Sequence, residues 1–122
     1  MQRAFAVLGA LSAALAVVAG AFAAHGLRGR VTPDLLAVFE TGARYQMYHA
    51  FGLLAVAWAL DRWPGGSAAL AGWLFVAGTV LFSGSLYLLA LGSPSWLGAV
   101  TPVGGLCFIA GWAVLAWVAA RG

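Results

Sequence analysis

The sequence predicts an all-α fold, an integral membrane antiparallel four-helix bundle, and three observations lead to this prediction. Hydrophobic residues make up 64% of the chain and charged residues only 7%, whereas an average soluble domain is about 25% charged. The hydrophobic residues fall into four long stretches, separated by charges, glycines and prolines. A stretch of about 20 such residues crosses a hydrocarbon core of about 30 Å. We therefore expect a single four-span transmembrane domain over residues 1–122.

The first span is predicted over residues 4–25, a stretch free of charged side chains. Gly26 is the expected end of its helix, because glycine commonly follows the last helical turn, and Arg28 and Arg30 then mark the aqueous side. A cleavable signal peptide is the alternative, since the chain starts with Arg3 and an apolar segment. That segment is longer than the usual apolar region of about 7–15 residues, which favours a retained span.

The second helix is predicted to begin at Pro33, with Thr32 as its N-cap. Proline suits the first helical position, and Asp34 in the first turn complements the helix dipole. A helix from Pro33 to residue 60 measures about 42 Å at 1.5 Å per residue, which exceeds the hydrocarbon core. We therefore expect residues 33–43 to lie in the membrane interface and residues 43–60 to span.

The third and fourth spans are predicted over residues 68–91 and 101–120. The segment "DRWPGGS" at residues 61–67 is typical of a turn, and it separates the second helix from the third. Thr101 is the expected N-cap of the fourth helix, with Pro102 in its first turn. Short connections between four helices predict antiparallel neighbours, with both chain ends on one side of the membrane.

The charges exclude some classes of function. Six arginines and no lysine are scattered singly along the chain rather than gathered into a basic patch, so we expect no nucleic-acid partner. The arginines divide evenly between the two sides, and the positive-inside rule assigns no orientation. The pattern contains no nucleophile–base–acid constellation and no phosphate-binding loop, so no catalytic residue is predicted. The single cysteine, Cys107, is interpreted as a packing residue.

Small residues are expected to bring the helices together, because close backbone approach drives association in lipid. Glycine accounts for 17 of the 122 residues, about twice its usual share of 7%. The predicted small-residue faces are Gly9, Ala13, Ala16 and Gly20 in the first helix, and Gly104, Cys107 and Gly111 in the fourth.

The polar residues inside the apolar body form the candidate site. His49 shares a helical face with Gly42, Tyr45 and Gly52, and His25 ends the first helix on the same side of the membrane. The third helix adds a predicted hydroxyl ladder, which consists of Thr79, Ser83 and Tyr87, with Ser85 nearby. Glu40 and Arg44 form an i, i+4 pair on a neighbouring face, interpreted either as a solvated pair or as a ligand clamp.

Two interpretations of this cluster remain open. In one, each histidine hydrogen-bonds a neighbouring helix and fixes its register. In the other, His25, Tyr45, His49, Ser83 and Tyr87 line a polar cavity near one interface, which binds a lipid headgroup, a quinone, a metal ion or a haem, or relays protons. His25 and His49 are an incomplete metal set without a third ligand, and haem ligation by both requires rings that face each other across one gap.

Four motifs together resemble the small YgdD-like membrane proteins, a bacterial family that carries a domain of unknown function and has eukaryotic relatives. The motifs are "GAFAAHGL" at residues 20–27, "YQMYHA" at 45–50, "LFSGSLY" at 81–87 and "TPVGGLCFIAGW" at 101–112. The family pattern usually has glycine where this chain has Ala23. The resemblance covers essentially the whole chain and implies a four-span inner-membrane protein. It implies no catalytic activity.

The resemblance also places Gln46, Ser85, Thr101 and Pro102 on motif positions. The predicted ligand-binding residues are therefore His25, Arg44, Tyr45, Gln46, His49, Ser83, Ser85, Tyr87 and Thr101. We expect a non-enzymatic protein of the bacterial inner membrane that binds a lipid-like ligand or a partner membrane subunit, with membrane lipids and a second copy of the chain as further partners. The alternatives are a redox protein that holds haem or a metal ion through His25 and His49, and a small-solute transporter.

Overall fold

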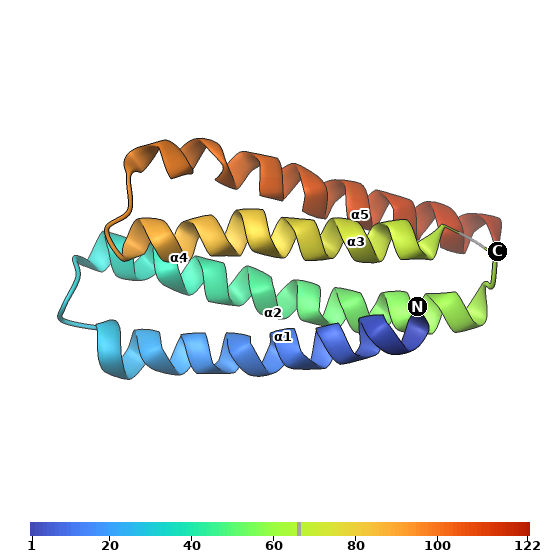
Figure 1. Cartoon of the computed structure of the whole chain (residues 1–122), viewed down its shortest axis with the longest axis horizontal. Helices are drawn as coiled ribbons and strands as arrows, with labels where there is room; N and C mark the ends of the chain where they lie inside the picture. The colour runs from blue at the N-terminus through green and yellow to red at the C-terminus, as the bar shows by residue number, and fades with distance from the viewer. Residues whose placement is uncertain (66) are drawn as a thin grey trace.

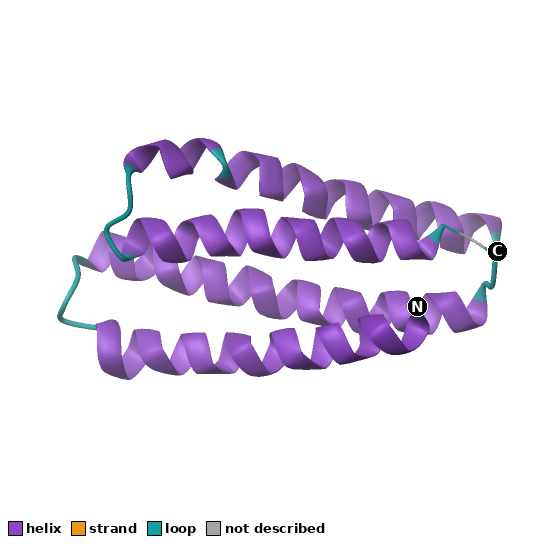
Figure 2. Ribbon diagram, viewed as in Figure 1, coloured by secondary structure: helices purple, strands orange, loops and turns teal. Residues whose placement is uncertain are grey.

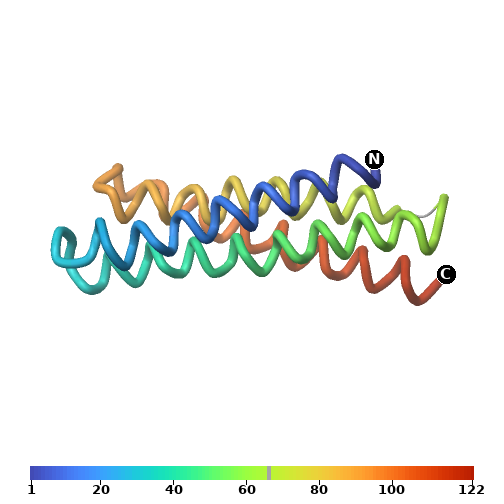
Figure 3. The backbone as a smooth tube through the Cα atoms, turned by 90° about the horizontal axis from the view of Figure 1, so that it is seen from below, coloured from blue at the N-terminus to red at the C-terminus, as the bar shows by residue number. Residues whose placement is uncertain are grey.

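The computed structural model describes residues 1–65 and 67–122, and in this part of the chain the regular elements are helices. They form four rods that lie side by side, with consecutive rods running in opposite directions (Figures 1 and 2). The two chain ends lie at the same end of the molecule (Figures 1 and 3). The all-α prediction is confirmed for the described residues.

The first rod joins α1 (Gln2–Phe22) to a π-helical turn, η1 (Ala23–Leu27). The predicted helix end at Gly26 is wrong, because Gly26 lies within η1 and the rod continues past it. A Cβ atom at Gly26 would stand 2.8 Å from the Phe22 ring, so that ring packs over the space that the glycine leaves open. The chain reverses at Gly29 instead, with φ at +84°, a conformation that favours glycine.

The second rod is α2 (Pro33–Arg62), one continuous helix of 30 residues. The predicted N-cap is confirmed, since the Leu35 N–H donates to Thr32 Oγ1 at 3.2 Å and Pro33 opens the first turn. The predicted interfacial segment 33–43 and the predicted span 43–60 are therefore two parts of one unbroken helix.

The third rod consists of α3 (Ala68–Gly78), the π-helical turn η2 (Thr79–Ser83) and α4 (Gly84–Ala90). A π turn inserts one extra residue into the helical ladder, and no sequence signal predicted it here. The fourth rod approaches this turn closely, because a Cβ atom at Gly104 would overlap the Phe82 backbone nitrogen.

The fourth rod begins with a short 3₁₀ helix, η3 (Ser95–Ala99), and continues as α5 (Thr101–Arg121). The prediction of Thr101 as N-cap is wrong, because Val100 is the cap residue and Thr101 is already helical. The Thr101 hydroxyl instead lies 2.5 Å from Ser85 Oγ of α4. A hydroxyl partner on the neighbouring rod has replaced the backbone N–H that an N-cap residue would bind.

The rods pack around α2, which runs along α1 on one side and along α3 and α4 on the other, while α5 packs against α3 and η2. The predicted small-residue contacts are confirmed at Gly9, which faces the Ala50 carbonyl oxygen, and at Gly104 and Gly111. Gly20 differs, because nothing lies within 4 Å of the space a Cβ atom would occupy. A central apolar cluster joins all the rods: Phe5, Leu53, Val56, Ala57, Ala71, Phe75 and Phe108.

The outer surface is made of large apolar side chains. Leu15 is 62% exposed and Ile109 is 67% exposed, on a scale that would make a water-soluble protein aggregate. By length and composition, three stretches qualify as membrane spans over the described residues: Gln2–Leu27, Ala68–Ala90 and Ser95–Arg121. The second rod, α2, does not qualify on that criterion, and it is the rod that carries the candidate polar site.

Candidate functional site

One face of α2 forms the centre of the candidate site. Gly42, Gln46 and His49 share this face at i, i+4 and i+7, and all three are buried. We call this the inner face of α2. Each of its residues is joined by a hydrogen bond to another rod.

Gln46 connects three rods through a single side chain. Its Nε2 atom donates to the Ser12 carbonyl oxygen of α1 at 2.9 Å, and its Oε1 atom accepts from the Tyr87 hydroxyl of α4 at 2.6 Å. The Tyr87 ring also packs against Gly42, where a Cβ atom would come within 2.9 Å of it. Gln46 therefore fixes α1 and α4 relative to α2.

His49 is joined to the fourth rod. Trp112 Nε1 of α5 donates to His49 Nε2 at 3.0 Å, and His49 Nδ1 lies 2.7 Å from the Tyr45 carbonyl oxygen. Because an indole nitrogen can only donate, Nε2 is the acceptor and Nδ1 carries the proton in this pattern. The imidazole ring stacks on Phe108 with centroids 3.5 Å apart and planes 5° apart. Both ring nitrogens and one ring face are thus occupied by protein groups.

Trp112 was not among the predicted site residues. Its side chain is 43% exposed, yet its N–H points inward to His49. A signal for this contact does exist in the sequence, because an indole N–H in the apolar part of a helix needs an acceptor. The sequence does not say which acceptor, since the register between α2 and α5 depends on the whole bundle.

The hydroxyls of the third rod reach their partners in different ways. Ser83 Oγ donates to the Gly42 carbonyl oxygen of α2 at 2.7 Å, and Ser85 Oγ donates to the Phe82 carbonyl oxygen at 2.9 Å in addition to its Thr101 contact. Thr79 Oγ1 binds its own helix, at the Phe75 carbonyl oxygen. The predicted ladder therefore reaches α2 only through Ser83 and Tyr87, because the Thr79 hydroxyl bonds to its own helix.

Among the described residues, the side chains of His25, Arg44 and Tyr45 take no part in these hydrogen bonds. His25 is exposed on η1, and Arg44 is exposed on a different face of α2. Tyr45 contributes its carbonyl oxygen to His49, but its side chain is 37% exposed and packs against Tyr48 and Phe82. The structure therefore does not place the His25 ring beside His49, whose ring contacts Phe75, Phe108 and Trp112.

Metal ligation by the two histidines stays a prediction. Among the described residues, no group of three or more His, Cys, Asp or Glu side chains could hold a metal ion. Ligation by His49 would also require its imidazole to give up the Trp112 or Tyr45 hydrogen bond, because each ring nitrogen already has a partner.

The buried polar groups satisfy one another. No buried side-chain nitrogen or oxygen lacks a hydrogen-bond partner in the described part of the chain. We call the inner face of α2 and its partners the polar network: Ser12, Gly42, Tyr45, Gln46, His49, Ser83, Tyr87 and Trp112. Because its buried polar groups are all paired with one another, the network can hold the rods in register. In the described part of the chain it leaves no unpaired buried group for a ligand to bind.

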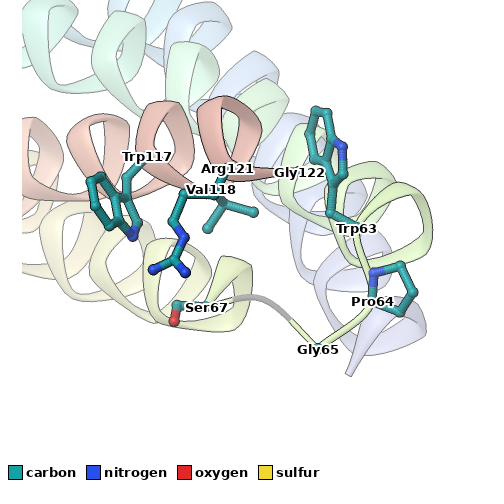
Figure 4. Close-up of a pocket in the computed structure, with 8 residues that line it drawn as sticks. All are labelled: Trp63, Pro64, Gly65, Ser67, Trp117, Val118, Arg121 and Gly122. Atoms are coloured by element: carbon teal, nitrogen blue, oxygen red, sulfur yellow. The ribbon is translucent and has the colours of Figure 1, made fainter.

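Open grooves lie at the surface of the bundle. One of about 410 Å³ borders Ser85 and Tyr87 on α4 and faces η3. Another, of about 320 Å³, lies at the end that holds the chain termini, where Trp117 and Arg121 project from α5 near Trp63 (Figure 4). Arg121 lies over the Trp117 ring at 5.3 Å. The second groove contains none of the predicted site residues.

The fold and the site together define a small helical membrane protein whose interior polar groups form hydrogen bonds with one another. The chain belongs to the DUF423 family, whose description reads "Protein of unknown function (DUF423)" and which matches residues 19–105. This confirms the predicted membership of a family with a domain of unknown function.

Relatives carry membrane-protein names. The chain is 50% identical over 121 residues to UPF0382 membrane protein YwdK of Bacillus subtilis (strain 168), covering 98% of both chains. It is 47% identical to UPF0382 membrane protein SERP0230 of Staphylococcus epidermidis and 45% identical to UPF0382 membrane protein SAB0533 of Staphylococcus aureus, with 93% of each chain covered. No solved structure matches the chain. The membrane location predicted from composition is thus supported by these names.

Proposed function

We propose that this chain is a non-enzymatic, four-span protein of the bacterial inner membrane that binds a lipid-like molecule in a groove on its surface. The motifs that resemble YgdD-like proteins support the inner-membrane assignment. The length of α2 supports the fourth span, because 30 residues extend about 45 Å at 1.5 Å per residue, more than the hydrocarbon core requires.

The groove beside Ser85 and Tyr87 is the observation that carries the proposal. Both hydroxyls are directed to protein partners, so the groove offers an occupant an apolar surface. Its other lining residues are Val80, Leu81, Gly84, Leu88, Leu97 and Val100. A lipid tail fits this chemistry, whereas a polar solute would find no free hydrogen-bonding group.

Gly84 adds a second argument for an occupant. Glycine inside a helix lowers stability by about 0.5–1 kcal/mol relative to alanine. In a helical bundle this loss is usually offset because the glycine lets a neighbouring helix approach closely. Among the described residues beyond its own helical turns, nothing lies within 4 Å of the space a Gly84 Cβ atom would fill. That space is therefore free for a ligand.

The other candidate functions have less support. Transport through the bundle requires polar groups that a solute can bind, and the interior groups of the polar network are already paired with one another. Haem or metal ligation at His49 requires the loss of an existing hydrogen bond. Lipid binding at the surface leaves the network intact.

Native mass spectrometry of the protein released from membranes tests the proposal. We expect the wild type to retain at least one lipid and Gly84→Leu, which fills the groove, to lose it. Ala110→Leu is the matched control, because Ala110 is exposed on α5 and lines none of the grooves described here. Equal lipid retention in all three proteins, or a stable dimer without lipid, would contradict the proposal.

A further inference from the structure

We propose that a third groove, between α1 and α2, binds the headgroup of a zwitterionic phospholipid with a primary ammonium group, as in phosphatidylethanolamine. Glu40 accepts hydrogen bonds from the ammonium group and Arg44 donates to the phosphate. This inference rests on the proposed lipid-binding function, but it uses different residues on a different face of the bundle.

The groove has a volume of about 230 Å³ and a floor of small residues. Its lining is Ala16, Gly20, Glu40, Ala43 and Arg44. Farther along the same pair of helices the backbones approach so closely that a Gly9 Cβ atom would stand 2.9 Å from the Ala50 carbonyl oxygen. At Gly20 nothing lies within 4 Å. The glycine at this position is therefore unexplained by protein packing, and it leaves room beside the two charges.

The two charges belong to the face of α2 that the polar network does not use. Glu40 and Arg44 are four residues apart and share a helical face with Tyr48, which we call the outer face of α2. Glu40 is half-buried and Arg44 is exposed. A carboxylate and a guanidinium one helical turn apart form a local dipole, and a phosphate joined to an ammonium group is its electrostatic complement.

The groove also lies at the depth where headgroups are found. The helix α2 extends about 45 Å, and the hydrocarbon core takes up about 30 Å of it. If the Arg62 end lies at one boundary of the core, about 15 Å at the Pro33 end project beyond the other boundary. Glu40 lies about 10 Å from Pro33 at 1.5 Å per residue, and Arg44 about 16 Å. The two side chains thus fall at the junction between headgroups and acyl chains.

The chemistry of the pair predicts which phospholipid is preferred. The guanidinium of Arg44 binds phosphate in every phospholipid and cannot discriminate among them. Glu40 discriminates, because a primary ammonium group can donate hydrogen bonds to a carboxylate and a quaternary ammonium group cannot. An anionic headgroup without an amine gains nothing from Glu40 and is repelled by it. The expected order is phosphatidylethanolamine above phosphatidylcholine and phosphatidylglycerol.

Competition in nanodiscs tests the assignment. The whole protein is placed in discs of equal parts phosphatidylethanolamine, phosphatidylcholine and phosphatidylglycerol, and the retained lipid is identified by native mass spectrometry. We expect about a tenfold preference for phosphatidylethanolamine, as one charge-assisted hydrogen bond supplies. Glu40→Gln should remove most of this preference, and Arg44→Gln should weaken retention of all three lipids. Asp34→Asn is the control for loss of an acid in α2 outside the groove.

Filling the groove separates this inference from the proposed function. Gly20→Leu should abolish the preference, whereas Ala14→Leu, a matched enlargement at an exposed position of α1, should leave it unchanged. Equal retention of the three lipids by the wild type, or an unchanged preference in Glu40→Gln, would overturn the headgroup assignment. If Gly84→Leu alone releases lipid, the proposed function stands and the headgroup site falls. If Gly20→Leu alone releases it, the headgroup site stands and the groove at Gly84 falls.

Discussion

The inner and outer faces of α2 carry polar residues in nearly equal measure, and the structure treats them in opposite ways. On the inner face, Gln46 and His49 are buried and bonded to other rods. On the outer face, Arg44 and Tyr48 are exposed, and Glu40 borders a groove. A polar residue in an apolar chain therefore has two separate uses: it can hold helices to one another, or it can meet something outside the protein.

The difference has a simple physical origin. In a bilayer the hydrophobic effect does not drive helices together, so interhelical hydrogen bonds and close packing set their positions. The inner face supplies both, because Gln46 binds α1 and α4 while Gly42 admits the Tyr87 ring. The outer face supplies neither. Substitutions on the two faces should consequently differ in what they change. Four predictions compare contacts inside the bundle, including those of the inner face, with a residue of the outer face.

The largest effect is expected where backbones touch. Gly104→Ala places a Cβ atom against the Phe82 backbone nitrogen, which cannot rotate away, so we expect a loss of about 3 kcal/mol in the free energy of unfolding. The neighbouring change Gly105→Ala is the control, since its nearest atoms stand 3.8 Å away. Unfolding titrations in mixed detergent measure both. Similar losses in the two variants would show that the close approach is not needed.

A smaller effect is expected within the polar network. Gln46→Leu leaves the Tyr87 hydroxyl without its acceptor, and we expect a loss of about 1–2 kcal/mol in the free energy of unfolding. Tyr87→Phe, introduced into the same variant, should recover part of this loss because it removes the unpaired hydroxyl. The same detergent titration, run as a double-mutant cycle, gives the coupling. Strictly additive losses would mean that the two side chains do not interact.

A single hydrogen bond at the edge of the network should matter less. Trp112→Phe removes the donor to His49 while keeping an aromatic ring against the bundle, and we expect a loss of about 0.6 kcal/mol. Trp117→Phe is the control, because Trp117 contacts Arg121 at the surface. Thermal unfolding measures both variants. Equal losses of stability would show that the hydrogen bond from Trp112 to His49 contributes nothing measurable.

The smallest effect on stability is expected on the outer face. Arg44→Gln should change the free energy of unfolding by less than about 0.5 kcal/mol, as exposed charges usually do, while its lipid retention falls. Parallel measurement of unfolding and of bound lipid separates the two properties. A loss of stability as large as that of Gln46→Leu would place Arg44 in the bundle's own structure rather than in a lipid site.

Local signals account for much of the fold. Charge-free stretches located the first, third and fourth rods. The pattern of Thr32, Pro33 and Asp34 located the start of α2 correctly, because an N-cap depends only on neighbouring residues. The same reasoning failed at Gly26 and Thr101. In both cases a contact with a distant or preceding side chain, rather than the local capping preference, determined what the residue does.

The candidate site was predictable only in part. The helical spacing around His49 correctly selected Gly42 as its neighbour on a buried face, and the motif match added Gln46. Helical spacing placed Arg44 with Glu40 on the neighbouring face, yet the predicted site included Arg44, because spacing alone does not show which polar face the other rods cover. That choice depends on where α1, α4 and α5 lie, and so does the pairing of His49 with Trp112.

The π turn at η2 has a consequence for how this chain tolerates changes in length. A residue in an α-helix turns about 100°, since 3.6 residues make a full circle. Deleting Val80 or Leu81 would restore an ordinary α-helical ladder and rotate one half of the third rod by about that angle against the other. Phe75 and Tyr87 could then no longer face inward together. The extra residue sets the rotation of α4 relative to α3. The middle of this rod should therefore accept substitutions far more readily than the deletion of one residue.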